Sequence, residues 1–138
     1  MIKPVAIAHA YKPDNVVTLY PGGCLDLLGA IGNGQMQLVV TSPPYNIGKE
    51  YEQRLCLDDY VLQQREVIAE CVRITHPEGH ICWQVGNYVD KGSIIPLDSL
   101  LFPVFQSLGL KMRNRIIWYF EHGLHCTRRF SRRHEMLN

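Results

Sequence analysis

Six consecutive residues, Thr41 to Asn46, have the types and spacing of a binding site for a flat ligand that carries an amino group. They read Thr-Ser-Pro-Pro-Tyr-Asn and follow an apolar run, residues 36–40, with the composition of a buried strand. Each proline fixes φ and lacks a backbone N–H, and the residue before a proline is driven out of the helical region. The chain therefore leaves the strand stiff and extended, with carbonyl groups free to accept hydrogen bonds beside the Tyr45 ring.

Alternating strand and helix patterns predict the elements that position this segment. Strands are expected over residues 15–20, 37–41, 80–85 and 111–119, and another begins at Met136-Leu137. Helices are expected over residues 24–31, over 59–75 with Asp58 as N-cap and Pro77-Glu78-Gly79 as the stop, and from 96 or 97 to 108 before Gly109.

This order of elements favours an α/β fold with a mainly parallel sheet. In such sheets, ligands bind beyond the carboxyl ends of the strands. Residues 42–45 and Gly86-Asn87 both follow predicted strands, so we expect them at the same rim.

The chain has 138 residues, which predicts a single domain over residues 1–138. Its net charge of +1 does not by itself indicate a nucleic-acid-binding protein. Seven of the 14 Lys and Arg residues, however, lie between Lys111 and the end of the chain, against only Glu121 and Glu135. This basic segment is either a solvated face or a surface that neutralises DNA phosphates.

The five cysteines show no Cys-x-x-Cys spacing, as is typical of reduced structural thiols in a cytosolic protein. There is no N-terminal signal segment and no apolar run of about 18 residues. We therefore expect a cytoplasmic protein with no membrane role. His122, His125 and Cys126 provide three metal donors, but the spacing predicts no fourth. No metal is predicted, and a polar or DNA-facing loop is expected there.

Residues 41–51 resemble the catalytic motif of S-adenosylmethionine-dependent DNA amino-methyltransferases, which methylate cytosine N4 or adenine N6. The likeness continues, in the family's order, at residues 22–28, 82–88, 113–118 and 129–135. It implies a partial Rossmann-like methyltransferase sheet, mostly parallel, and a role in DNA methylation, as in bacterial or phage-like restriction-modification systems.

The resemblance assigns catalysis to Ser42, Pro43, Pro44 and Tyr45. An exocyclic amino nitrogen is a poor nucleophile, because its lone pair is delocalised into the ring. The Ser42 side chain and the Pro43 carbonyl would accept its two hydrogens, while Tyr45 stacks on a base flipped from the duplex. A methyl group held nearby then transfers mainly through positioning. Ser at position 42 favours cytosine N4 without excluding adenine N6.

The resemblance also implies S-adenosylmethionine as cofactor and double-stranded DNA as partner. Cofactor contacts are expected at Cys24, Leu25, Thr41 and Asn46. DNA contacts are expected at Lys49, Tyr51, Arg128, Arg129, Arg132 and Arg133.

Two departures from the family pattern concern the cofactor. The chain contains no glycine-rich Phe-x-Gly-x-Gly segment, and Gly23 stands where the family has an acidic residue near the cofactor's adenine. We therefore expect a truncated domain that lacks the strands of the cofactor loop, exposes an apolar edge at residues 37–41, and is incomplete or inactive alone. A complementing chain could supply that half. The alternatives are a non-catalytic DNA-binding or subunit-interaction module derived from such an enzyme, and a remnant without function.

Overall fold

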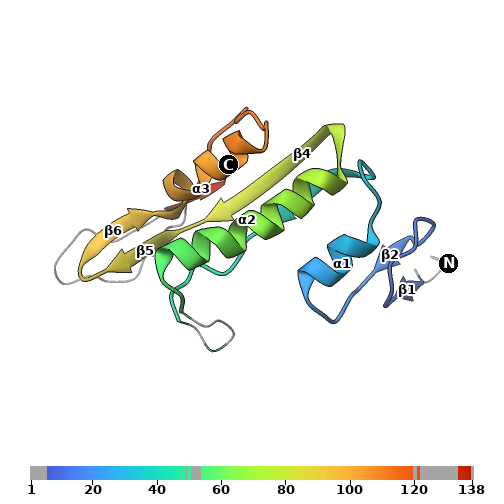
Figure 1. Cartoon of the computed structure of the whole chain (residues 1–138), viewed down its shortest axis with the longest axis horizontal. Helices are drawn as coiled ribbons and strands as arrows, with labels where there is room; N and C mark the ends of the chain where they lie inside the picture. The colour runs from blue at the N-terminus through green and yellow to red at the C-terminus, as the bar shows by residue number, and fades with distance from the viewer. Residues whose placement is uncertain (1–5, 49, 51–53, 120, 122–133, 138) are drawn as a thin grey trace. The chain divides into compact units, whose positions relative to one another are not determined.

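The computed structural model describes residues 6–48, 50, 54–119, 121 and 134–137. Its elements are, in chain order (Figure 1), β1 (Ile7–Ala8), β2 (Val17–Thr18), α1 (Cys24–Ala30), β3 (Met36–Thr41), α2 (Leu57–Ile74), β4 (Thr75–Val85), β5 (Asn87–Asp90), β6 (Ser93–Pro96), α3 (Leu97–Ser107), β7 (Ile116–Tyr119) and β8 (His134–Leu137). The central sheet has the strand order β3-β4-β8-β7, and two smaller sheets pair β1 with β2 and β5 with β6.

The expected α/β class is confirmed, but the sheet is mixed and not mostly parallel. Strand β8 pairs antiparallel with β4, where Val85 lies opposite Met136, and antiparallel with β7, where Trp118 lies opposite Glu135. Consecutive strands that are not joined by a crossover helix pair in this way, and no helix pattern occurs between β7 and β8. The last strand therefore returns between its predecessor and β4.

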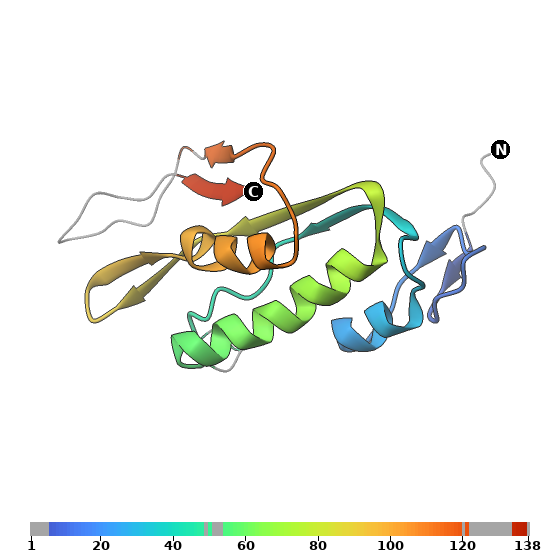
Figure 2. The same cartoon turned by 45° about the horizontal axis from the view of Figure 1, so that its top comes forward.

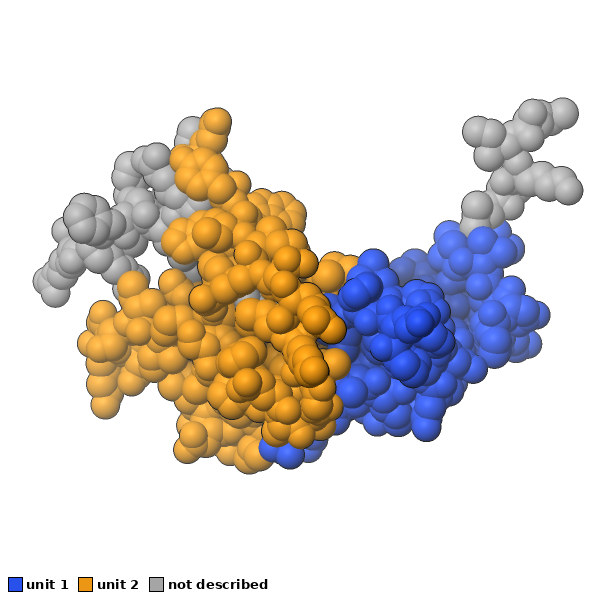
Figure 3. All heavy atoms as spheres, turned by 90° about the horizontal axis from the view of Figure 1, so that it is seen from above, with its two compact units in different colours: residues 1–39, 65–81 blue, residues 40–64, 82–138 orange. Residues whose placement is uncertain are grey.

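The chain divides into two compact units, which Figure 3 colours separately. Unit 1 comprises residues 1–39 and 65–81, and its buried residues are Ile31, Ile68, Cys71 and Ile74. Burial raises the pKa of the Cys71 thiol to about 11, so this thiol is a neutral core group.

Unit 2 comprises residues 40–64 and 82–138. Its buried hydrophobic residues are Tyr60, Trp83, Val85, Tyr88, Leu97, Leu101 and Val104. The Trp83 and Phe105 rings meet edge to face, with centroids 5.6 Å apart and planes at 72°. This pair holds α3 against the end of β4.

Helix α2 has the predicted period. Its buried residues Tyr60, Gln64, Ile68, Cys71 and Ile74 recur every three or four positions, which places them on one face. The helix begins at Leu57, so Asp58 lies in its first turn and is not the N-cap that we expected. An acid in that turn still interacts favourably with the helix dipole.

Pro77-Glu78-Gly79 lies within β4, although the sequence predicts a stop there. Tertiary pairing overrides the local turn signal. A Cβ atom at Gly79 would lie 2.9 Å from the Gln37 carbonyl oxygen, so glycine lets the β3 backbone approach closely.

The β5–β6 hairpin was not predicted, because Gly86-Asn87 was expected to end the preceding strand. The chain instead passes from β4 directly into β5 and turns back beside α3 (Figure 2). Lys91 and Gly92 both have positive φ, 44° and 87°, as a tight two-residue hairpin turn requires. The Lys-Gly pair between Tyr88-Val89 and Ile94-Ile95, which are strong strand formers, is the sequence signal that could have revealed it.

The remaining expected elements are found with shorter bounds. Helix α3 ends as predicted before Gly109, whose φ is 83°. The strand expected over residues 15–20 is reduced to β2, and the one expected over residues 111–119 is reduced to β7. Strand β8 confirms a strand at Met136-Leu137, but it begins two residues earlier, at His134.

The apolar edge that we expected is confirmed among the described residues. Strand β3 lies at one end of the strand order, and Leu38 and Val40 are 57% and 65% exposed. Strand β2, which could have covered this edge, pairs with β1. No helix in the described part of the chain is long and apolar enough to cross a membrane.

Candidate active site

The segment that leaves β3 places Ser42 and Tyr45 in a chain of hydrogen bonds. Their hydroxyl oxygens lie 2.9 Å apart. The Tyr45 hydroxyl donates to Glu135 Oε2 at 3.1 Å, and Gln84 Nε2 donates to the same oxygen at 2.9 Å. Strands β3, β4 and β8 thus each bring a polar side chain to one point of unit 2.

The two prolines between these residues differ in their hydrogen bonding. The Pro44 carbonyl accepts from the buried Tyr60 hydroxyl at 3.1 Å. Pro43 is buried, and none of the described residues donates to its carbonyl oxygen. A backbone carbonyl without a donor is unusual at a buried residue, because most backbone groups there are paired. The geometry therefore leaves an acceptor beside Ser42 that a ligand's N–H group can satisfy.

Asn46 fixes the exit from this segment. It is 2% exposed, and its φ of 59° lies in the left-handed region, which asparagine tolerates better than most residues. Its side chain donates to the Leu55 carbonyl at 2.9 Å and accepts from the Leu55 N–H at 2.7 Å. This amide clamps the two ends of the loop together, so its evident role is structural; a cofactor contact at Asn46 stays a prediction.

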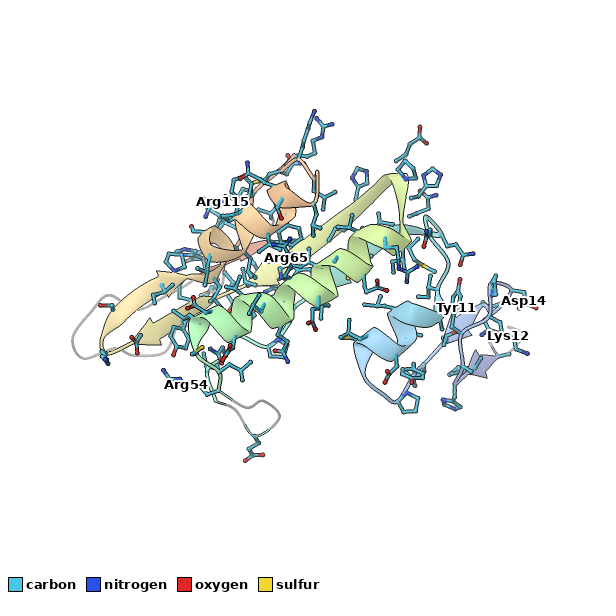
Figure 4. The ribbon with its side chains drawn as sticks, in the orientation of Figure 1. Tyr11, Lys12, Asp14, Arg54, Arg65 and Arg115 are labelled. Carbon is cyan, nitrogen blue, oxygen red and sulfur yellow. The ribbon has the colours of Figure 1, made fainter. Side chains whose placement is uncertain are left out.

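Arg54 ties the end of the same loop to β5. Its guanidinium donates to the Tyr88 hydroxyl at 2.8 and 3.1 Å and to the Val89 carbonyl at 3.3 Å. It also lies 5.0 Å from the centroid of the Tyr88 ring, within the range of a cation–π interaction. Figure 4 shows Arg54 projecting from the segment that precedes α2. Both ends of the loop after Tyr45 are therefore anchored.

The other predicted cofactor residues lie in different units. Cys24 and Leu25 are exposed at the start of α1 in unit 1. Thr41 is the last residue of β3 in unit 2 and is partly exposed. Their side chains are accessible, and their cofactor role stays a prediction.

The predicted DNA-contacting residues lie outside the part of the chain that the structure describes. These are Lys49, Tyr51, Arg128, Arg129, Arg132 and Arg133. The same holds for His122, His125 and Cys126, which were considered as metal donors. Among the residues that are described, no group of three His, Cys, Asp or Glu side chains could hold a metal ion.

Sequence reasoning did not select Glu135 or Gln84 as site residues. Glu135 falls in the last segment that resembles the family, which was the only available signal. Gln84 lies inside a strand pattern, where a polar residue is unremarkable. The pairing of β4 with β8 brings Gln84 to Glu135, whose carboxylate also accepts from the hydroxyl of Tyr45.

The fold is that of DNA methyltransferases of known structure. The structure superimposes on PvuII DNA methyltransferase (cytosine-N4-specific) with a TM-score of 0.73 and 18% identity, over 86% of this chain and 46% of that one. The family model N6_N4_Mtase, described as DNA methylase, matches residues 36–138. The chain belongs to this family.

Two relatives extend the comparison. The chain is 44% identical to the type II methyltransferase M.BglII of Bacillus subtilis, over 97% of its own length and 38% of the relative's. It is 32% identical to M.ScaI of Streptomyces caespitosus, over 94% and 42%. The chain therefore spans about two fifths of the length of these relatives.

The structure is also similar to that of TTHA0409, a putative DNA modification methylase from Thermus thermophilus, complexed with S-adenosyl-L-methionine. The TM-score is 0.65 at 25% identity, over 84% of this chain and 51% of that one.

Proposed function

We propose that this chain carries the base-binding part of a DNA amino-methyltransferase that methylates cytosine N4 or adenine N6 of a flipped base. The observation that carries the proposal is the pair of acceptors after β3. Ser42 Oγ and the carbonyl of buried Pro43 are neighbours in the chain, and no described residue donates to that carbonyl.

An amino group offers two hydrogens, and two adjacent acceptors match them. When both hydrogens are bonded, the nitrogen lone pair is drawn out of conjugation and becomes nucleophilic. The Tyr45 ring, held by its hydroxyl at Glu135, would stack on the face of the base. These three residues would orient one nitrogen for in-line attack, which is a positioning effect.

S-adenosylmethionine is the cofactor that this family implies, and accessible residues among those predicted to contact it suit that role. When bound, it would supply a methyl group on a sulfonium; transfer would break the carbon–sulfur bond as the nitrogen–carbon bond forms, and one proton of the amino group would leave to solvent. Cys24 and Leu25 are exposed and suit contact with a flat apolar surface, and the Thr41 hydroxyl suits a polar contact. The Asn46 amide is less suited, because it is held by Leu55.

We propose double-stranded DNA as the partner and a restriction-modification system as the setting, because the M.BglII and M.ScaI relatives are type II methyltransferases. A cytoplasmic location accords with DNA as the substrate. DNA contacts at Lys49, Tyr51 and the four arginines Arg128, Arg129, Arg132 and Arg133 remain part of the proposal.

A segment that carries the rest of the cofactor site would complete the enzyme. The exposed apolar residues Leu38 and Val40 on the edge strand β3 support this idea, because such edges are normally paired or covered. The same edge also favours the alternative, a non-catalytic subunit-interaction module.

The test measures transfer of a labelled methyl group from S-adenosylmethionine to unmethylated double-stranded DNA. One arm contains this chain alone, and the other adds the portion of M.BglII that this chain does not match. We expect transfer in the second arm, little in the first, and loss of transfer on Ser42→Ala. Digestion of the product to nucleosides then distinguishes N4-methylcytosine from N6-methyladenine.

The DNA affinity of the chain is measured against salt concentration in parallel. Salt-dependent DNA binding without transfer in either arm would replace the enzyme with the DNA-binding module. Absence of both would overturn both readings and favour a remnant.

A further inference from the structure

The hydrogen bonds that meet at Glu135 have a direction that chemistry fixes. An ionised carboxylate only accepts hydrogen bonds. The Tyr45 hydroxyl at 3.1 Å and Gln84 Nε2 at 2.9 Å therefore both donate to Glu135 Oε2. This assignment also sets the orientation of the Gln84 amide, with its nitrogen toward the carboxylate.

The direction at Glu135 determines the direction at Ser42. A phenol has one hydrogen, and that of Tyr45 is directed at Glu135. In the contact of 2.9 Å between the Ser42 and Tyr45 hydroxyls, Ser42 must therefore be the donor. The only hydrogen on Ser42 Oγ is then turned toward Tyr45, and the lone pairs of Oγ are left to accept.

We infer that Glu135 is a positioning residue of the methyl-transfer site, which acts through Tyr45 to make Ser42 an acceptor for the amino group of the base. The inference rests on the proposed function for its catalytic consequence. Glu135 lies in β8 and is the third member of the hydrogen-bond chain, after Ser42 and Tyr45. It therefore needs no contact with the base.

The charge on Glu135 is what makes this device work. If residue 135 carried a neutral amide, its oxygen or its NH₂ group could face Tyr45, and the phenol could then accept and leave Ser42 free to rotate. A serine hydrogen that points at the amino group would compete with the hydrogen bond that activates it. The Glu135 side chain is partly buried, so solvent screens this effect incompletely.

The first test measures methyl-transfer kinetics of this chain combined with the portion of M.BglII that it does not match. Glu135→Gln should lower kcat about tenfold or more and change KM for DNA little, because the interaction is needed for activation and not for binding. Glu135→Asp keeps the charge and should recover part of the loss. In a Tyr45→Phe background, Glu135→Gln should cost no more than about twofold, because the route through Tyr45 is already broken.

The matched control is Glu78→Gln, which neutralises an exposed glutamate of β4 and should leave kcat unchanged. Equal losses from Glu135→Gln in the two backgrounds would overturn the inference, as would an unchanged kcat. The inference would also be overturned if kcat and the thermal unfolding midpoint fell in proportion across all variants, because that pattern indicates a structural role.

A spectroscopic test does not require activity. The tyrosine doublet in the Raman spectrum reports whether a phenol donates or accepts a hydrogen bond, and the difference between the chain and its Tyr45→Phe variant isolates Tyr45. We expect a donor signature that weakens in Glu135→Gln and persists in Glu78→Gln. An acceptor signature, or one insensitive to residue 135, would overturn the inference. If methyl transfer fails but the donor signature responds as expected, the proposed function is wrong and the hydrogen-bond assignment stands.

Discussion

The Tyr45 hydroxyl lies 3.1 Å from Glu135 Oε2, although 90 positions separate the two residues in the chain. Tyr45 follows the edge strand β3, and Glu135 lies in β8, which is inserted between β4 and β7. The mixed order of the sheet is therefore what completes the polar chain around Ser42.

Ser42→Ala should leave the fold intact and reduce methyl transfer. Removing one acceptor from the transition state costs about 1–3 kcal/mol, which corresponds to a decrease in kcat of about five- to 150-fold. The measurement is the single-turnover rate of labelled methyl transfer in a complemented preparation. Ser99→Ala, at an exposed position of α3, serves as the control. A wild-type rate in Ser42→Ala would remove Ser42 from the proposed mechanism.

Asn46→Ala should destabilise unit 2. The change deletes both hydrogen bonds to Leu55 at a residue that is 2% exposed and places alanine at a φ of 59°. We expect a loss of about 2–4 kcal/mol in the free energy of unfolding in urea.

Asn46→Gly separates the two causes, since glycine accepts the positive φ and still loses the hydrogen bonds. It should be less destabilising than Asn46→Ala. Equal stability of wild type and Asn46→Ala would mean that the clamp contributes nothing.

Glu70 should make unit 1 sensitive to acid. The hydrogen bond from Arg73 lowers the pKa of this carboxyl, with a smaller contribution from the charge of Arg73, while burial opposes the shift. A carboxyl whose pKa falls on folding stabilises the protein above its unfolded value, near 4.5. That contribution is lost as the pH falls through the lower folded value.

Glu70→Gln should therefore lower the urea midpoint at about pH 7 and have a smaller effect at about pH 3, because the stabilising contribution decreases once the pH lies below the unfolded value near 4.5. Both side chains are about one third exposed, so the difference should also shrink in salt. A difference that is the same at both pH values would contradict the linkage.

Arg115→Met should destabilise the junction between α3 and β7. Arg115 pairs with Asp98, whose side chain is 5% exposed, and lies beside α3 (Figure 4). Removing the cation leaves a buried carboxylate without its partner, at a cost of about 1–3 kcal/mol, because the exposed arginine is partly screened.

The double variant Arg115→Met with Asp98→Asn provides the control for this pair. It should recover part of the loss in thermal stability, because the buried charge is removed with its partner. A double variant that is less stable than the sum of the two single changes would contradict this account.

The local elements could largely be predicted from the sequence. The helical period of residues 59–75 and the apolar run before Thr41 correctly predicted α2 and β3, and Gly109 marked the end of α3. Local periodicity predicted these elements because each reflects which side of one segment is buried. The antiparallel insertion of β8 and the inclusion of Pro77–Gly79 in β4 were not predicted, because both depend on which strands become neighbours.

The candidate site also has a part that the sequence determines and a part that depends on the tertiary structure. The sequence by itself determined the stiff Ser-Pro-Pro-Tyr segment, because proline restricts the backbone whatever surrounds it. It also determined the family, through an ordered set of matching segments. Only the tertiary structure decided that Tyr45 and Gln84 both donate to Glu135, and that Asn46 is engaged with Leu55. Hydrogen bonds between distant side chains depend on strand pairing and register, and no periodicity in the chain encodes these.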